Sequence, residues 1–113
     1  MKPRSRDAVS LLQGTVDLLI LRAIQHEPAH GYAISRRVRD RTDGVLAIED
    51  AALYQALHRL EAREWIEADW GLSENNRRAK YYSLTTTGRR QLRDEVVTWQ
   101  RYAAAMSRVI EPA

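Results

Sequence analysis

The spacing of apolar residues changes along this chain at Trp65, and that change limits the folds open to it. Before Trp65, apolar residues recur every three or four positions, as on one face of an α-helix. Trp65–Trp70 and Lys80–Leu84 instead alternate apolar and polar residues, as half-buried strands do. A helical period returns after Thr87. Because 113 residues form one domain rather than two, the helices and the strands must share one core.

Three helices are predicted before the change. The first covers about Leu11–His26 and ends before Pro28, whose ring opposes a continued helix. The second covers about His30–Arg41, and the third runs from Glu49 or Asp50 to Arg63, with Asp50 as the expected N-cap. The first helix is apolar on most sides, which suggests contacts both with its own core and with a second copy of the chain.

A hairpin and a long helix complete the chain. A nine-residue loop, Gly71–Ala79, joins the two expected strands, in which Trp65 and Trp70 are expected to pack the hairpin, with Trp65 nearest the core. The last helix covers about Gly88–Ile110. The fold class is therefore mainly α with a small β-hairpin, a winged helix-turn-helix followed by a long C-terminal helix. The expected divisions are a flexible basic lead (1–10), a DNA-binding domain (11–86) and a dimerisation helix (87–113).

The last helix carries a heptad pattern of the kind that pairs helices. Its members are Leu92, Val96, Trp99, Ala103, Met106 and Ile110. We expect no part of this chain's own core to remain for the seam to pack against, so the seam predicts a homodimer. Leu11 and Leu18 of the first helix are expected to contribute to the same interface. Packing back on the first helix alone is the alternative. Trp99 could also stack on a planar aromatic ligand, although an indole more often simply fills an interface.

The net charge of +3 conceals a strong segregation of charge. Residues 77–93 hold six basic residues and no acidic one, and residues 36–41 are also basic, whereas residues 61–69 are mostly acidic. Basic stripes beside a helix-turn-helix and a hairpin are typical of nucleic-acid binding, and an ordinary solvated face is the alternative.

This layout assigns roles to specific side chains. The third helix can enter a major groove, where Gln55 suits adenine and Arg59 suits guanine. The hairpin loop can follow phosphates or place an Arg in a minor groove, and the second helix can position the domain on the backbone. The expected DNA-binding residues are Tyr54, Gln55, His58 and Arg59 on the third helix, Asn75, Asn76, Arg77, Arg78 and Lys80 in the wing, and Tyr32 and Arg36 on the second helix. Solvent exposure alone is the alternative for each, and Tyr54 could belong to the core.

An enzyme is not expected. The string His26-Glu27-Pro28-Ala29-His30 matches the H-E-x-x-H zinc motif, but Pro28 opposes the continuous helix that the motif needs. The chain has no Cys, and it lacks the glycine-rich phosphate-binding patterns. We therefore predict no metal and no cofactor. No long apolar stretch or signal peptide is evident, which predicts a cytoplasmic protein with no membrane partner.

Four segments together resemble the motifs of PadR-type transcriptional regulators in order and spacing. They are Gly14–Leu21 (GTVDLLIL), His30–Ile34 (HGYAI), Leu53–Glu61 (LYQALHRLE) and Tyr82–Gly88 (YSLTTTG). The resemblance implies a homodimeric winged-helix DNA binder of the short form, usually a repressor, whose first and last helices form the dimer interface. It also implies release from DNA by a signal, in some members an aromatic compound bound near an interfacial Trp.

The chain departs from the family pattern at three positions. Ala52 stands where Ser or Thr is common, and Gln55 stands where Pro is common. Glu64 replaces a common Gly that would end the third helix in the left-handed conformation, so we expect Glu64 to end it in another way.

These observations together predict a sequence-specific DNA-binding transcriptional regulator. We expect it to be a repressor that binds a pseudo-palindromic operator in double-stranded DNA as a homodimer, with a small aromatic molecule as a possible effector. The alternative from another class is a winged-helix module that binds proteins rather than DNA.

Overall fold

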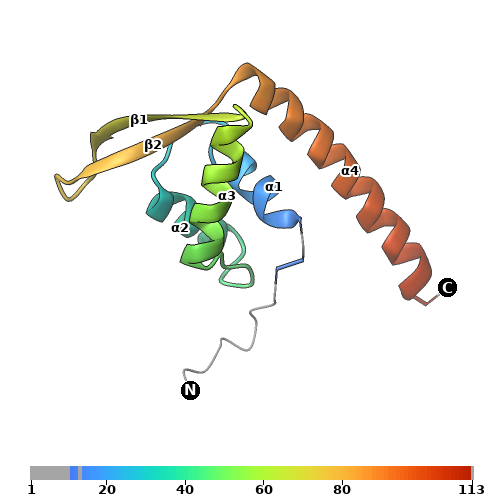
Figure 1. Cartoon of the computed structure of the whole chain (residues 1–113). Coiled ribbons are helices and arrows are strands. Elements are labelled where there is room, and N and C mark those ends of the chain that lie inside the picture. Colours follow the sequence, from blue (N-terminus) through green and yellow to red (C-terminus); the bar gives the residue numbers. More distant parts are fainter. Residues whose placement is uncertain (1–10, 13, 113) are drawn as a thin grey trace.

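The computed structural model describes residues 11–12 and 14–112 (Figure 1). Its elements are α1 (Thr15–Ala23), α2 (Gly31–Arg41), α3 (Asp50–Ala62), β1 (Ile66–Leu72), β2 (Arg78–Leu84) and α4 (Thr86–Ile110). This order confirms the predicted winged helix-turn-helix followed by a long C-terminal helix. The basic lead expected at residues 1–10 lies outside the described residues.

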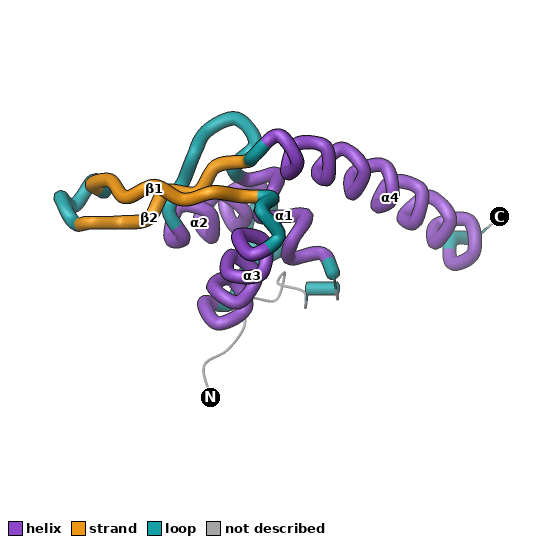
Figure 2. Tube along the Cα trace, turned by 45° about the horizontal axis from the view of Figure 1, so that its top comes forward, coloured by secondary structure: helices purple, strands orange, loops and turns teal. Residues whose placement is uncertain are grey.

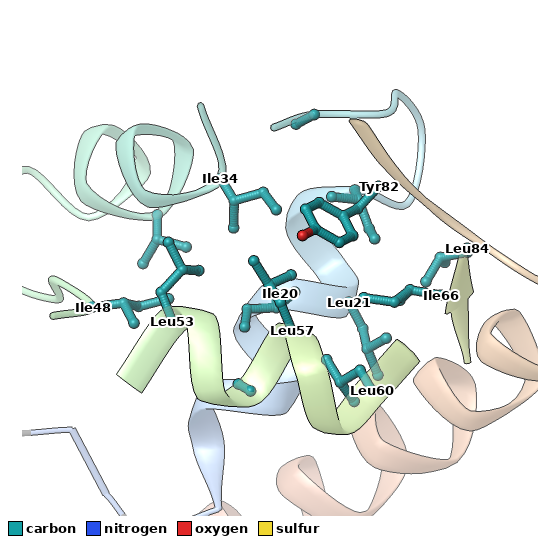
Figure 3. Close-up of a cluster of buried hydrophobic side chains, with 14 of the residues drawn as sticks. Ile20, Leu21, Ile34, Ile48, Leu53, Leu57, Leu60, Ile66, Tyr82 and Leu84 are labelled. Carbon is teal, nitrogen blue, oxygen red and sulfur yellow. The ribbon is translucent and has the colours of Figure 1, made fainter. Parts of the chain in front are cut away.

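The core lies where the first three helices meet the base of the hairpin (Figure 3). Ile20 and Leu21 of α1, Ile34 of α2, and Leu53 and Leu57 of α3 are each at most 1% exposed. Ile66, Tyr82 and Leu84 close the core from the hairpin. Truncating a buried leucine of this kind usually costs about 2–5 kcal/mol of stability, so this cluster holds the helices in place.

Helix α1 is shorter than the apolar pattern predicts. Its N-cap, Gly14, has φ +86°, and the Thr15 hydroxyl donates to the Leu12 carbonyl at 2.6 Å, so the backbone at Leu11 and Leu12 is not helical. The helix ends at Ala23, well before Pro28. The Arg37 guanidinium of α2 donates to the carbonyl oxygens of Ala23 (2.8 Å) and Glu27 (2.9 Å), which satisfies groups that a longer helix would have paired.

The ends of α3 differ from the prediction in two details. The N-cap is Glu49 rather than Asp50, and its side chain makes no capping hydrogen bond. Glu64 adopts φ +61°, so it ends the helix in the left-handed conformation that we expected only of the family's Gly. A side chain in that conformation carries strain of about 1–2 kcal/mol, which surrounding contacts must offset.

The hairpin is longer and its loop shorter than predicted. The antiparallel pairing extends from Ile66↔Leu84 to Leu72↔Arg78, which leaves the five residues 73–77 as the turn. Only the pairs nearest Ile66 lie on the core, so the outer pairs are held by backbone hydrogen bonds rather than by apolar contacts. We call β1, the turn and β2 the wing.

The wing is attached to the helices through the link between α1 and α2. Ala29 exchanges two backbone hydrogen bonds with Tyr82, at 2.9 and 3.1 Å, and Ala29 is almost fully buried. This short bridge fixes the direction in which the wing leaves the core (Figure 2).

Helix α4 starts at a tight junction with the end of α3. The Thr85 hydroxyl donates to the Glu64 carbonyl (2.6 Å) and accepts from the Gly88 amide (3.0 Å), while the Thr85 amide donates to the Trp65 carbonyl (3.1 Å). A Cβ on Gly88 would lie 1.9 Å from the Trp65 carbonyl oxygen, so only glycine fits. We call these residues the α4 junction. It directs α4 away from the side on which the wing extends (Figures 1 and 2).

The predicted seam of α4 is not wholly free. Leu92 is only 3% exposed because it packs into the chain's own core, and Val96 packs against the same cluster. The expectation that the seam has no core of its own to cover is therefore wrong at its N-terminal end. Trp99, Met106 and Ile110 remain 38%, 41% and 68% exposed, respectively.

Replacing Gly88 with Ala tests the α4 junction. In an ordinary helix this change stabilises by about 1 kcal/mol, but here the new Cβ would overlap the Trp65 carbonyl. We expect the free energy of unfolding to fall by at least about 2 kcal/mol in urea titrations at fixed protein concentration. The exposed neighbour Thr87, changed to Ala, is the control and should stay within about 0.5 kcal/mol of wild type. A Gly88→Ala protein as stable as wild type would contradict the junction.

Candidate nucleic-acid interface

A groove of about 730 Å³ runs between the wing and the exposed side of α2, with Tyr54 of α3 at its edge. Its aromatic lining is His30, Tyr32, Tyr54, Trp70 and Tyr82, and its basic lining is Arg36, Arg37, Arg77, Arg78 and Lys80. Only two acidic residues, Asp40 and Glu74, line the same groove. The groove is therefore electropositive, and it brings together expected site residues from all three elements.

The middle of the exposed face of α3 carries Gln55 and His58, whose side chains are free of the core. Tyr54 lies at the edge of that face and is 54% exposed, so it is not a core residue. A Cβ on Gly31 would lie 2.6 Å from the Tyr54 hydroxyl oxygen. Glycine at that position therefore lets α2 approach the Tyr54 ring closely.

Arg59 faces away from the groove. Its guanidinium forms an ion pair with Asp17 of α1, and Arg63 reaches the same carboxylate at 3.8 Å. The hydrogen bond that Arg59 donates to the Asp17 carboxylate raises the pKa of Arg59. The structure thus places Arg59 on the α1 edge of the exposed face of α3, one helical turn from Gln55.

The turn of the wing owes its shape to backbone hydrogen bonds. The Ser73 amide donates to the Arg77 carbonyl (2.8 Å), and the Asn76 amide donates to the Ser73 carbonyl (2.9 Å). Asn76 adopts φ +59°, which asparagine tolerates better than most residues. The side chains of Asn75, Asn76 and Arg77 are exposed at this tip.

Lys80 sits deeper in the groove than the tip residues. Its ammonium lies 3.5 Å from the Glu61 carboxylate of α3 and 5.8 Å from the centre of the Tyr82 ring. Part of its charge is therefore offset within the protein, and the freer cations of the wing are Arg77 and Arg78.

Helix α2 presents a small aromatic and basic cluster to the groove. The Tyr32 ring is 63% exposed, stacks on His30 with centroids 6.4 Å apart, and lies under the Arg36 guanidinium at 5.9 Å. His30 itself caps α2, because its Nδ1 accepts a hydrogen bond from the Ala33 amide at 3.1 Å.

The basic run at residues 77–93 divides into two sites. Arg77 and Arg78 lie at the far end of the wing, whereas Arg89, Arg90 and Arg93 lie on the first turns of α4, at the opposite end of β2 (Figure 1). Only the first group lines the groove. These basic residues are close in the sequence, but strand β2 separates the two groups in space.

Known proteins share this arrangement. The model of the transcriptional regulator PadR-like family matches residues 20–94. An uncharacterized protein of Lysinibacillus sphaericus is 36% identical over 89 residues, which is 79% of this chain and 82% of that protein. The chain belongs to the PadR-like family of transcriptional regulators.

Solved structures agree with this assignment. A transcriptional regulator from Clostridium thermocellum superposes with a TM-score of 0.80 and 28% identity, over 88% of this chain and 96% of that chain. A PadR family transcription regulator from Clostridium difficile R20291 gives 0.73 and 28%, over 84% of this chain and 97% of that chain. The resemblance drawn from the four sequence segments is confirmed, as is the expectation that the protein is not an enzyme.

The zinc-motif string has another role in this PadR-like regulator. His26, Glu27 and His30 lie in the link between α1 and α2 rather than on one helix, and His30 is the N-cap of α2. Among the residues that the structure describes, no three His, Asp or Glu side chains cluster as metal ligands.

A second cavity, of about 480 Å³, lies between the start of α1 and the middle of α4. Leu12, Leu18, Trp99 and Tyr102 line it together with Glu95. The Trp99 and Tyr102 rings are 6.2 Å apart. Tyr102 was missed in the sequence analysis, although it follows Trp99 at the helical spacing of three.

The remaining seam residues occupy intermediate positions. Leu11 and Leu18 are half-buried against the core, and Ala103 is half-buried on α4. In the part of the chain that the structure describes, no helix is long and apolar enough to cross a membrane.

The buried Tyr82 gives a prediction about pH. Burial raises the pKa of Tyr82, an effect that the nearby Lys80 ammonium partly opposes. The unfolded chain therefore loses this proton first, near its usual value of about 10, and stability falls as the pH rises above that value. We expect Tyr82→Phe to lose less stability than wild type between about pH 9 and 11 in urea titrations. The exposed Tyr32, changed to Phe, should behave as wild type, and equal losses in all three proteins would contradict this.

Proposed function

We propose that this PadR-like regulator binds operator DNA as a homodimer and represses transcription. The observation that carries the proposal is the electropositive groove beside the exposed polar face of α3. An α-helix fits the major groove, and cations that flank it can contact the phosphates on either side. The wing and α2 supply those cations here.

Within this proposal α3 reads the bases. Gln55 and His58 occupy the middle of its exposed face, and Tyr54 stands at the edge nearest the groove. Gln55 can form paired hydrogen bonds with adenine. To bind a base, the Arg59 guanidinium would have to give up at least part of its ion pair with Asp17. We therefore rank Arg59 below Gln55 as a base-contacting residue.

The wing and α2 supply affinity more than specificity. Arg77 and the polar tip residues Asn75 and Asn76 can follow the phosphates, which carry no sequence information. Tyr32 and Arg36 lie across the groove from the wing and can hold the opposite side of the same backbone. Lys80 can also contact a phosphate if its ammonium leaves the Glu61 carboxylate or binds the phosphate and Glu61 together.

The exposed apolar side of α4 supports the dimer. Trp99, Met106 and Ile110 lie on it, and the half-buried Ala103, Leu11 and Leu18 border it. Leu92 has almost no surface left to contribute, so we remove it from the interface. A two-fold dimer would present two α3 helices to successive major grooves about 34 Å apart, which predicts a pseudo-palindromic operator.

Repression is the simpler mode of action for such a dimer. Covering promoter DNA requires only the DNA-binding surface, whereas activation requires a further surface for the transcription machinery. A regulator of this kind acts where the chromosome is, so we place it in the cytoplasm.

The cavity beside Trp99 supports an effector site. Its aromatic and aliphatic lining suits a flat aromatic molecule, which would stack on the indole of Trp99. Because the cavity joins α1 to α4, a bound molecule could change how the two copies pack and so release the operator.

Removing wing cations tests the DNA interface. Arg77→Ala combined with Arg78→Ala should weaken binding to all duplex DNA and reduce the slope of log affinity against log salt by about 1 for each lost phosphate contact. Fluorescence anisotropy with DNA from upstream of the protein's own gene gives both quantities. The control, Arg90→Ala with Arg93→Ala, removes the same charge from α4 and should leave the slope unchanged. A wild-type protein that binds no DNA at low salt would instead support the protein-interaction alternative.

A charge on the apolar side of α4 tests the dimer. Met106→Asp places a carboxylate in the proposed interface, and we expect it to yield monomers by sedimentation velocity and to lose operator binding. The matched control is Val97→Asp, because Val97 is 55% exposed on another side of the same helix. A wild-type monomer, or a Met106→Asp protein that remains a dimer, would contradict the assigned interface.

A further inference from the structure

We propose that Trp70 is a positioning residue that orients Arg78 for the minor groove of DNA, and that this pair gives the regulator a preference for A·T-rich sequence beneath the wing. The proposal rests on the DNA-binding function argued above. Trp70 was expected to pack the hairpin, yet it is 58% exposed.

The strand register places both residues on the same face of the wing. Ile66↔Leu84 and Ala68↔Tyr82 share one face with Trp70↔Lys80 and Leu72↔Arg78. The first two pairs reach the core, and the last two lie beyond it, where the same face borders the groove. Trp70 therefore lies on the hairpin face that begins in the core, but beyond the core itself, and most of its side chain is exposed to solvent.

The contact that Trp70 makes is with a cation. The Arg78 guanidinium carbon lies 4.4 Å from the centre of its ring, the shortest such distance among the cation–π pairs of the described residues. Trp65 also has a cation partner, Arg63 at 5.1 Å, but unlike Trp70 it packs against the core. Arg77, one residue away, has no aromatic partner among the described residues.

An oriented arginine suits a narrow minor groove. A free arginine loses rotational freedom about several side-chain bonds when it enters the minor groove. An arginine that is already stacked on an indole has less of this freedom to lose. The minor groove of A·T-rich DNA is narrow and strongly negative, and it attracts inserted arginines. The indole of Trp70 can remain at the edge of the DNA minor groove, against the sugars, while the Arg78 guanidinium enters the minor groove.

The test compares two operators that differ only in the base pairs beneath the wing, one A·T-rich and one G·C-rich. The readout is the ratio of the two affinities, which does not depend on how much of a variant is folded. We expect Trp70→Leu to reduce the A·T preference about three- to tenfold and Trp70→Phe to retain most of it. Arg78→Lys should reduce the preference as Trp70→Leu does, and Arg77→Lys should leave it unchanged.

A double variant tests whether Trp70 acts through Arg78. The double variant Trp70→Leu with Arg78→Lys should be no worse than either single variant, because both remove the same oriented guanidinium. An unchanged ratio in Trp70→Leu, or additive losses in the double variant, would overturn the role of Trp70 while wild-type DNA binding stands. Failure of the wild-type protein to bind either operator would overturn the proposed function itself.

Discussion

The α4 junction joins the winged helix-turn-helix to helix α4 through Thr85 and Gly88. There the Thr85 hydroxyl joins the left-handed end of α3 at Glu64 to the first turn of α4, and the missing side chain of Gly88 lets that turn rest on the Trp65 carbonyl. The junction links the helix proposed to read DNA with the helix proposed to form the dimer. A small rotation there would move the two α3 helices of a dimer by several ångströms, because α4 acts as a lever 25 residues long.

The distribution of charge follows from the same arrangement. Arg77 and Arg78 lie at one end of strand β2, and Arg89 and Arg90 lie beyond its other end. Basic residues from one stretch of the sequence are therefore found at two ends of the molecule. The groove keeps only the wing cations together with Arg36 and its neighbours. Acidic side chains restrain some of the others, as Asp17 does for Arg59 and Glu61 does for Lys80. Position in the fold, rather than the number of cations, decides which of them can meet a phosphate.

The sequence predicts the fold well because apolar spacing reports burial directly. The order of elements and the exposed side of α3 both follow from it. It fails where tertiary contacts decide the outcome. Leu92 fits a heptad seam but packs in its own core, Glu64 accepts a strained backbone because Thr85 binds its carbonyl, and Arg59 pairs with a residue 42 positions away. Trp70 was misread because alternation identifies a face of the hairpin without showing where the core ends.

We propose that the α4 junction sets the two α3 helices of a dimer one turn of DNA apart. The chain has no Cys, so Ala62→Cys in the exposed last turn of α3, away from the first turns that would enter the DNA groove, gives a single attachment site for a spin label. Pulsed electron resonance on the DNA-bound protein measures the distance between the two labels. We predict one distribution centred roughly 30–45 Å apart, allowing for the label arms around a half-site spacing of about 34 Å. A distance well outside that range, or no dipolar coupling between the labels, would exclude a dimer with its two α3 helices one turn of DNA apart.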